Sequence, residues 1–368
     1  MDTLSKLALC LTPGLGPTTV RRLVESFPDK DIFDLPAKEL VAAFGGHRDI
    51  VHNIVSRSAF ARAAQELEFC QKNGIRVLFF TDKDYPQRLN NPETADCPAL
   101  LFVLGETDLN ASRTVGIVGT RHATAQGRET TARLVSQLVP LNTPIISGLA
   151  YGIDTASHAA AVDNGLPTVA VLGHGLDRIY PAQNRPLASR LIRAGGALVT
   201  EYPSGTAINP RFFPARNRII AALSDAVVVV ESSEKGGSLI TATIAAGYHR
   251  EVFAVPGRLT DTYAKGTNNM IATNKALLVR DADDIAYQMG WPLSRPQNAA
   301  ANQQTLFPTL NAEAQNIIER LRQKGPMGLA ELALDCDKPI AQMASLLFNL
   351  ELQEAVRVLP GQVYESRI

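Results

Sequence analysis

Arginines and phenylalanines alternate in the segment RFFPARNRIIAALS, and this pattern is the clearest chemical signal in the sequence. Arg211, Arg216 and Arg218 can neutralise phosphates. Phe212 and Phe213 offer ring faces for base stacking. Basic groups interleaved with aromatic rings are typical of surfaces that bind single-stranded nucleic acid, and less typical of small-metabolite pockets. The segment therefore predicts a polyanion site that also holds bases.

The two phenylalanines have different predicted roles. If the segment is an extended loop, adjacent side chains point to opposite sides, so one ring reaches the ligand. Phe213 lies nearer to Arg216 and Arg218 and is predicted to stack, with Phe212 as the core anchor. In the alternative interpretation, one phenylalanine belongs to the core and Arg218 pairs with an acid such as Glu231.

Two windows of the chain contain no carboxylate. Residues 109–128 have no Asp or Glu but include Arg113, Arg121 and Arg128, and residues 202–224 contain the segment above. The whole chain has 36 basic and 36 acidic residues and a net charge of zero, which by itself argues against nucleic acid. Binding must therefore come from local patches such as these windows. Chance clustering in a chain that is only 20% charged is the alternative.

The stretch TVGIVGTRHATAQG combines a strand-like run with a glycine turn. The apolar run ends in Gly116 and Gly119, as at the start of a dinucleotide-binding domain, but the third glycine of G-x-G-x-x-G is missing and Arg121 stands at the turn. The next strand candidate, PIISG, ends in Ser147 and Gly148, so the acid that binds a ribose is also missing. No G-x-x-x-x-G-K-[ST] motif is present, which excludes a P-loop ATPase. The turn therefore predicts a phosphate site that lacks the residues with which known dinucleotide and P-loop sites bind a nucleotide.

Loops at the carboxyl ends of the strand candidates should meet at one edge of a parallel sheet, where ligands bind. Glycine and serine dominate these loops, and such small residues let a bulky polyanion approach backbone N–H groups. Ser238 is predicted to cap the helix LITATIAAGYHR at its positive end. The loops are residues 119–121, 147–149, 173–175, 201–203 and 232–238.

Short apolar runs alternate with helical patterns in residues 69–290. Several runs are rich in Val and Ile on both faces, as strands covered by helices on both sides are. The predicted fold class is α/β, with an extended Rossmann-like, doubly wound and mainly parallel sheet. The strand candidates are RVLFF, ALLFVLG, TVGIVG, PIISG, TVAVLG, ALVTEY, AVVVVE, EVFAVPG and ALLVRD.

Helical segments flank this predicted domain. Residues 1–68 should form a helical domain in which LTPGLGPTTVRRLVESF resembles a helix-hairpin-helix, with Thr18 or Thr19 near the second helix start. Its glycine turn is equally compatible with phosphate binding and with plain packing. Residues 291–309 are predicted to be a linker because they are polar and lack periodicity.

Residues 310–368 read as three helices and a small hairpin, the pattern of a winged-helix module. Its third helix carries almost no basic residues, since Lys338 is offset by Asp337, Glu351 and Glu354. We therefore expect this module to contact protein and not a DNA groove.

Several classes of protein are not expected. No run of about 18 apolar residues suggests a membrane span, and the N-terminus lacks a signal-peptide cleavage site, so a cytoplasmic location is expected. The four cysteines are scattered and the six histidines lack metal-ligand spacing, so we expect no metal, cofactor or catalytic residue. A nucleotide-cleaving phosphoribohydrolase is the alternative, because SEKGGSLITA loosely resembles the P-G-G-x-G-T-x-x-E turn. Ala242 and Thr243 stand where that glutamate would be.

Seven separated motifs across residues 75–285 resemble the DprA/Smf family of DNA-processing proteins. They are YPQRL with PALLFVLG, then GIVGTRHATAQG, SGLAYGIDTASHAAA, LGHGLDRIYPAQN, FPARNRIIAALS, EKGGSLITA and PGRLTDTYAKGTNNMI. Tyr151 departs from the family's more usual arginine, and TNKALL departs from its glycine-alanine pair. The flanking domains also look like family accessories.

The resemblance implies a single-stranded DNA-binding recombination mediator that is not an enzyme. It implies protection of incoming DNA, loading of the RecA recombinase during natural transformation, and a homodimer formed through the Rossmann-like domain. Together with the residue chemistry, it predicts a set of DNA- and phosphate-binding residues. These are Gly119, Thr120, Arg121, Ser147, Gly148, Phe213, Arg216, Asn217, Arg218, Lys235, Gly236, Gly237 and Ser238.

Overall fold

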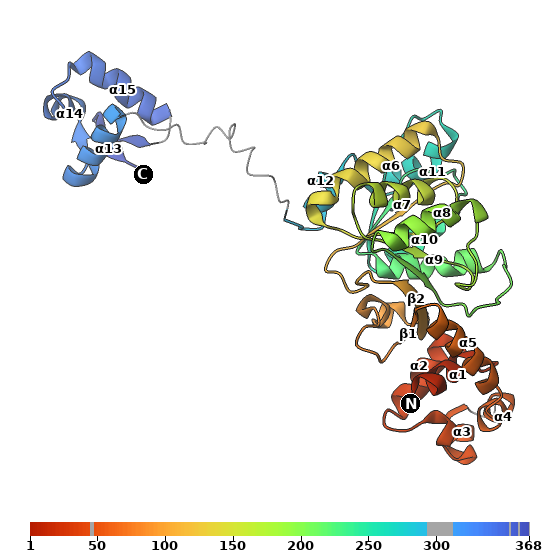
Figure 1. Ribbon diagram of the computed structural model, residues 1–368. Coiled ribbons are helices and arrows are strands. Elements are labelled where there is room, and N and C mark those ends of the chain that lie inside the picture. The colour runs from red at the N-terminus through yellow and green to blue at the C-terminus, as the bar shows by residue number, and fades with distance from the viewer. Residues whose placement is uncertain (45–47, 293–311, 353–354, 360, 368) are drawn as a thin grey trace. The chain divides into compact units, whose positions relative to one another are not determined.

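A computed structural model describes residues 1–44, 48–292, 312–352, 355–359 and 361–367 (Figure 1). The chain divides into two compact units, Met1–Ser294 and Arg295–Ile368. Most of the predicted linker 291–309 lies outside the described residues. Within the described ranges, no helix has the length and apolar character needed to cross a membrane.

A nine-stranded sheet forms the centre of the first unit, in the order β1-β2-β6-β5-β4-β3-β7-β8-β9. The strands from β6 to β9 in this order are parallel, and β2 pairs antiparallel with both β1 and β6. The predicted doubly wound, mainly parallel sheet is confirmed. The strands are β1 (Ile75–Phe79), β2 (Leu100–Gly105), β3 (Val115–Val118), β4 (Ile145–Ser147), β5 (Thr168–Val171), β6 (Ala197–Thr200), β7 (Ala226–Val229), β8 (Glu251–Ala254) and β9 (Leu277–Leu278).

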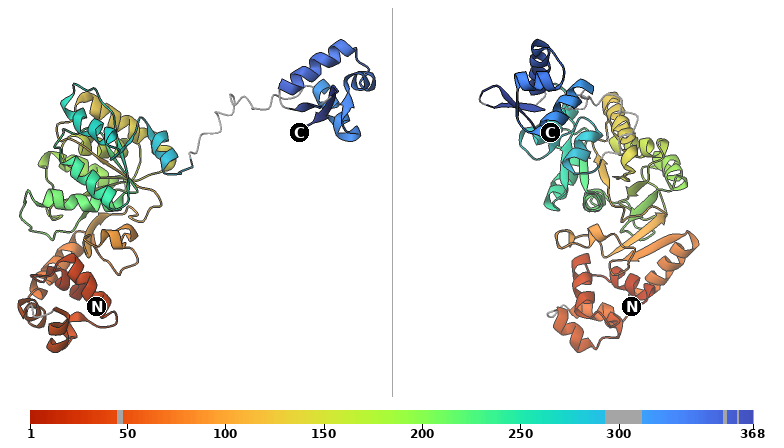
Figure 2. Two further views of the ribbon diagram at one scale, coloured as in Figure 1. Left: turned by 180° about the vertical axis from the view of Figure 1, so that it is seen from behind. Right: turned by 90° about the vertical axis from the view of Figure 1, so that its left-hand side faces the viewer.

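Helices cover both faces of this sheet (Figures 1 and 2). Alternate residues of a strand point to opposite faces, and in β7 Val228 joins the core under α6, α7 and α12 while Val227 and Val229 join the core under α9 and α10. The apolar runs therefore have no polar face. The helices are α6 (Ala125–Gln137), α7 (Ile153–Asp163), α8 (Arg185–Arg193), α9 (Phe212–Leu223), α10 (Ser238–Gly247), α11 (Lys265–Ala272) and α12 (Ala282–Gln288).

The N-terminal segment is helical and shares a continuous core with the sheet face under α9 and α10. The glycine turn between its first two helices packs against α4, where the Asn53 amide donates to the Pro13 carbonyl at 3.3 Å. The second helix is capped by Gly16 and not by Thr18 or Thr19, since Pro17 is its first residue. The helices are α1 (Thr3–Leu11), α2 (Pro17–Ser26), α3 (Ala37–Phe44), α4 (Arg48–Val55) and α5 (Phe60–Lys72), so residue 68 falls inside α5.

The second unit is a winged helix, as its sequence pattern predicts. Its three helices enclose a separate small core that includes Ile317, Leu332 and Leu347. The wing is a three-stranded sheet in the order β10-β12-β11. The elements are α13 (Ala312–Lys324), β10 (Met327–Gly328), α14 (Leu329–Asp335), α15 (Ile340–Leu352), β11 (Val356–Leu359) and β12 (Val363–Ser366).

Candidate nucleic-acid interface

The order in which successive strands are added to the sheet reverses between β3 and β7. After β3 the chain builds β4, β5 and β6 on one side, and it then returns through α9 to place β7 on the other side of β3. A crevice opens at the carboxyl ends of strands at such a switch point, and ligands of parallel sheets bind there.

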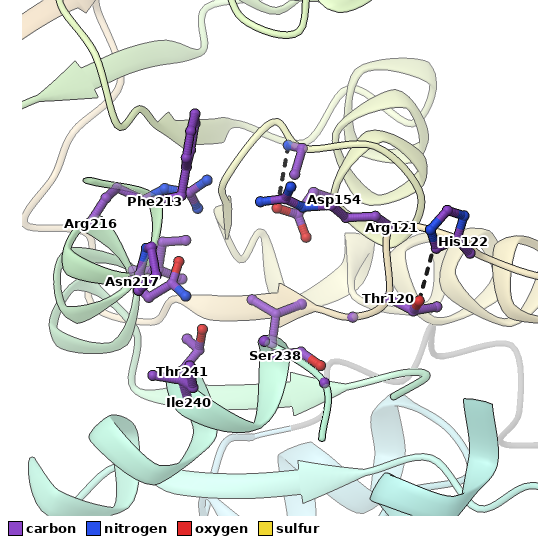
Figure 3. A pocket seen from close by; sticks show the side chains of 17 residues that line it. Thr120, Arg121, His122, Asp154, Phe213, Arg216, Asn217, Ser238, Ile240 and Thr241 are labelled. Carbon is purple, nitrogen blue, oxygen red and sulfur yellow. Dashed lines mark hydrogen bonds between the residues drawn. The ribbon is translucent and has the colours of Figure 1, made fainter. Parts of the chain in front are cut away.

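A cavity of about 320 Å³ lies at this point, within the range of small-ligand sites. It is bounded by the turn after β3, the start of α7, the first turns of α9 and the N-terminus of α10 (Figure 3). Most of the predicted site residues line it: Gly119, Thr120, Arg121, Phe213, Arg216, Asn217, Gly236, Gly237 and Ser238. Its other lining residues were not predicted: Val118, His122, Ala150, Asp154, Pro214, Ile220, Ile240 and Thr241.

Arg121 is the exposed cation of the cavity. Its guanidinium carbon lies 5.7 Å from the centroid of the Phe213 ring, a cation–π arrangement. Among the described residues, Arg121 has no carboxylate within salt-bridge distance. Its charge is therefore available to an anion.

Arg216 lies beneath the same cavity and is only 4% exposed. One Nη donates to the Gly148 carbonyl at 2.9 Å, and the buried Nε has no hydrogen-bond partner. Burial lowers the pKa of Arg216 to about 10, and the charge of Asp154 opposes that shift. A second, buried positive charge therefore lies next to the cavity and favours an anion there.

Asp154 supplies the matching negative charge and is 6% exposed. Its Oδ2 accepts hydrogen bonds from the backbone N–H groups of Gly148 at 3.2 Å and Ala150 at 3.4 Å. Burial raises the pKa of this carboxyl group, and the Arg216 charge acts in the opposite direction. Although PIISG ends without an acid, as the sequence shows, Asp154 of the following helix reaches the end of that strand.

Four predicted residues do not line the cavity. The fully buried Ser147 hydroxyl donates to the Ile117 carbonyl at 2.6 Å, and Lys235 is exposed beside the cavity. Gly148 supports Arg216 as described, because a Cβ at this position would overlap the guanidinium.

Arg218, the fourth of these residues, points away from the cavity. Its two Nη atoms donate to the Glu201 carboxylate at 2.6 and 2.7 Å, and its Nε donates to the Asp96 carbonyl at 3.0 Å. Burial lowers the pKa of Arg218, but the hydrogen bonds and charge of Glu201 raise it more. The alternative interpretation, in which Arg218 pairs with an acid, is therefore the one observed, and the acid is Glu201 and not Glu231.

The extended loop expected for the two phenylalanines is wrong, because Phe212 is the first residue of α9. Pro214 stands in the first helical turn, where a missing N–H does no harm. Phe212 is half-buried and not a core anchor, and it stacks on Tyr202 with ring centroids 4.4 Å apart. Phe213 is also half-buried, and its ring lies 5.5 Å from that of Tyr180.

The N-terminus of α6, where a dinucleotide pyrophosphate would bind, is occupied by a side chain of the protein. The Glu231 carboxylate accepts hydrogen bonds from the backbone N–H of Thr124 at 3.0 Å and from its hydroxyl at 2.5 Å. A Cβ on Gly127 would overlap this carboxylate. Glu231 thus excludes a pyrophosphate, which agrees with the incomplete dinucleotide motif.

The N-terminus of α10 is open to the cavity instead. Gly236, Gly237 and Ser238 bring it there, and its first turn has no acidic residue. Ser238 is the first helical residue and not the cap, since Gly237 occupies the cap position and the Ser238 hydroxyl donates to the Ser232 hydroxyl at 3.0 Å. The positive end of this helix dipole favours an anion in the cavity.

Titratable groups in the described ranges offer no metal centre, since no three His, Cys, Asp or Glu side chains are placed to hold a metal ion. Asp154, the carboxylate that lines the cavity, is buried and accepts hydrogen bonds from the backbone N–H groups of Gly148 and Ala150. The arrangement is suited to holding an anion beside an aromatic ring.

Two protein families match the chain. The family described as DNA recombination-mediator protein A matches residues 76–290, and the DprA winged helix domain matches residues 295–362. Protein Smf of Synechocystis is 32% identical, over 98% of each chain. DNA processing protein DprA of Bacillus subtilis is 41% identical, over 58% of this chain and 71% of that protein.

Solved structures show the same likeness. The structure of DprA from Streptococcus pneumoniae matches with a TM-score of 0.68 and 32% identity, over 78% of this chain and 98% of that chain. The structure of DprA from Helicobacter pylori, described as binding single-stranded DNA, matches with a TM-score of 0.52 and 27% identity, over 58% of this chain and 95% of that chain.

Proposed function

The chain belongs to the DprA/Smf family of DNA recombination mediators, and on this basis we propose that it binds single-stranded DNA through the cavity between β3 and β7. The observation that carries the proposal is the cavity itself. It combines Arg121, which has no carboxylate partner among the described residues, with the buried Arg216, the open N-terminus of α10 and the half-buried ring of Phe213. Cations beside an aromatic face are what a strand with unpaired bases requires.

We further propose that the protein protects incoming single strands and loads RecA on them during natural transformation. Family membership supports this step, since a mediator must hold a single strand before a recombinase takes it. Titration of RecA filament formation on DNA coated with a single-strand-binding protein, with and without this protein, tests it. Equal rates in both reactions would contradict RecA loading.

We propose a homodimer that forms through the free edge of the sheet. β9 is an edge strand, and its Leu277 and Leu278 are 39% and 44% exposed. An apolar edge strand readily pairs with a second chain. Leu278→Arg should convert a dimer to a monomer in light scattering, and an unchanged mass would show that the edge is not the interface.

We propose that the protein acts without catalysis. A nucleotide-processing phosphoribohydrolase on a related sheet is the competing function, and such an enzyme needs an accessible general acid or base. Asp154 is buried and bonded to two backbone N–H groups, which speaks against that role.

A binding assay run beside a turnover assay decides between the two functions. We expect a mobility shift with single-stranded oligonucleotides, a weaker shift with duplex, and no release of base from nucleoside monophosphates. Release of base without a mobility shift would support the hydrolase and contradict the proposed function.

A further inference from the structure

Aromatic rings lie on both sides of the cavity, and they come from the first turn of α9 and from the segments after β3, β5 and β8. Phe213 and His122 line the cavity at its two sides, with Arg121 between them (Figure 3). The Tyr180 ring lies 5.5 Å from that of Phe213, and the Tyr263 ring lies 6.4 Å from that of His122. We call these four rings with Arg121 the ring track.

The Tyr180 end of the track follows β5. Tyr180 is 43% exposed, although it touches Phe213, so a large part of its ring faces solvent. Its backbone N–H donates to Nε2 of His174 at 3.2 Å, which holds the loop in place. Burial lowers the pKa of His174, so the imidazole stays a neutral acceptor for this N–H.

The Tyr263 end of the track lies in the loop after β8. The Tyr263 carbonyl accepts the N–H of Ser232 at 2.7 Å, which joins this loop to the one after β7. The His122 and Tyr263 rings are nearly parallel, with 22° between their planes. The backbone N–H of His122 donates to the Thr120 hydroxyl at 3.2 Å, so the turn after β3 fixes this ring as well.

A second groove begins where the track ends at Tyr263. Its volume is about 1160 Å³, and Tyr263, Arg133, Arg258 and Arg280 are among the residues that line it. A strand that passes Tyr263 would meet Arg133 and Arg258 there, together with Arg280, which is paired with Asp284 at 2.6 Å. The carboxylates of Glu129, Glu231 and Asp261 also line the groove, so its charge is mixed. Residues that follow β3 and residues that follow β7 line both the cavity and the groove.

Two carboxylates near the track are engaged by the protein. Glu231 is held by Thr124 at the N-terminus of α6, and Asp177 pairs with Arg178 at 2.6 Å. Asp261 is exposed in the loop that carries Tyr263, and Arg258 lies in the same loop. The interactions of Glu231 and Asp177 reduce the repulsion that a phosphate backbone would meet.

We propose that single-stranded DNA crosses the switch point along the ring track, with one base stacked on Tyr180 and another on the His122–Tyr263 pair. The nucleotide between them places its phosphate at Arg121. This inference rests on the proposed binding of single-stranded DNA and adds two rings that do not line the cavity, Tyr180 and Tyr263, as stacking positions. Stacking tolerates any sequence, because every base has a π face.

Alanine and phenylalanine variants at the two tyrosines test the track. The probes are a fluorescent oligothymidylate of about 16 nucleotides, within common single-strand site sizes, and thymidine 5′-monophosphate as a short probe with one base and one phosphate. Tyr180→Ala and Tyr263→Ala should each weaken binding of the longer probe about tenfold, as expected for the loss of one base–aromatic stack. The mononucleotide, which occupies the cavity and is too short to reach from Arg121 to both tyrosines, should change less than about twofold. Tyr180→Phe and Tyr263→Phe should restore the affinity, because they keep the ring.

Tyr287→Ala is the matched control, since Tyr287 is an 86% exposed tyrosine of α12 that lines neither the cavity nor the groove. Melting temperatures confirm that each variant is folded. Unchanged binding of the longer probe by both alanine variants would overturn the track while the proposed function stands. Equal losses for both probes would also overturn it, because the rings would then act on the cavity. Failure of the unaltered protein to bind either probe would contradict the proposed function itself.

Discussion

The guanidinium of Arg216 occupies the space where a side chain on Gly148 would begin. A Cβ at position 148 would overlap Nη1, and the Gly148 carbonyl accepts from Nη2 at 2.9 Å. The backbone N–H of the same residue donates to Asp154. Gly148 therefore joins the buried cation and the buried anion beneath the cavity, and its lack of a side chain is what permits this arrangement.

Gly148→Ala should displace Arg216 and weaken single-strand binding. The overpacked site should also lose about 1–3 kcal/mol of folding free energy. Fluorescence anisotropy and urea denaturation measure the two effects. Gly247→Ala is the control, because a Cβ there meets nothing within 4 Å. Full affinity in Gly148→Ala would show that the position of Arg216 does not matter for binding.

Phe213→Ala should weaken oligonucleotide binding by about 1–3 kcal/mol and leave polyphosphate binding nearly unchanged, because polyphosphate has no bases. Competition titrations with both ligands measure this difference. Phe212→Ala should affect mainly stability, since Phe212 stacks on Tyr202. Equal loss of DNA and polyphosphate binding in Phe213→Ala would contradict stacking and leave only the electrostatic part of the site.

Removal of the winged helix should leave most of the single-strand affinity. Residues 1–294 form a compact unit, and a cut there keeps Trp291, which packs on the core of that unit. The third helix of the winged helix, α15, has no basic residue in its sequence IAQMASLLFNLEL. A loss of more than about tenfold, or about 1.4 kcal/mol, would show that the winged helix itself binds DNA.

His158 should make folding stability depend on pH. Burial lowers the pKa of His158 to about 3 from a usual value of 6.5. Between these two pH values the imidazole is protonated in the unfolded chain and neutral in the folded chain. Stability is then complete above pH 6.5 and decreases as the pH falls toward 3, by about 1.4 kcal/mol per unit for this group.

Chemical denaturation at pH 7 and pH 4.5 measures this dependence. His158→Asn keeps a donor for the Thr168 hydroxyl, which Nδ1 contacts at 2.7 Å, and should be less sensitive to pH than the unaltered protein. The same pH dependence in both proteins would show that His158 is not responsible.

The sheet was predictable from sequence because its central strands, β3 to β7, are buried on both faces. In an apolar run such as AVVVVE, polar and apolar residues do not alternate, so the run is distinct from a strand with one face exposed to solvent. The glycine turn after β3 and the loop at α10 were also predictable, because small residues at strand ends have few other uses. Both now line the cavity.

Arg216 and Arg218 could not be told apart by composition. Residues two apart on a helix project to different sides, since each residue turns the helix by about 100°. Arg216 thus lies under the cavity while Arg218 binds Glu201. Pro214, the third residue of α9, is compatible with the first turn of a helix as well as with a loop, so it does not decide between the two. Asp154 and Glu231 reach their places only through tertiary packing, which no local pattern encodes.

Titration of single-stranded DNA against the unaltered protein and Arg121→Ala, over a range of salt concentrations, tests the central claim most directly. The Arg121→Ala variant should lack one phosphate contact and should therefore bind more weakly. The slope of log affinity against log salt concentration should be smaller by about 0.7, with an unchanged melting temperature. Arg22→Ala, which removes an exposed arginine from α2, should match the unaltered protein. An unchanged affinity and an unchanged slope in Arg121→Ala would contradict the assignment of this cavity as the DNA site.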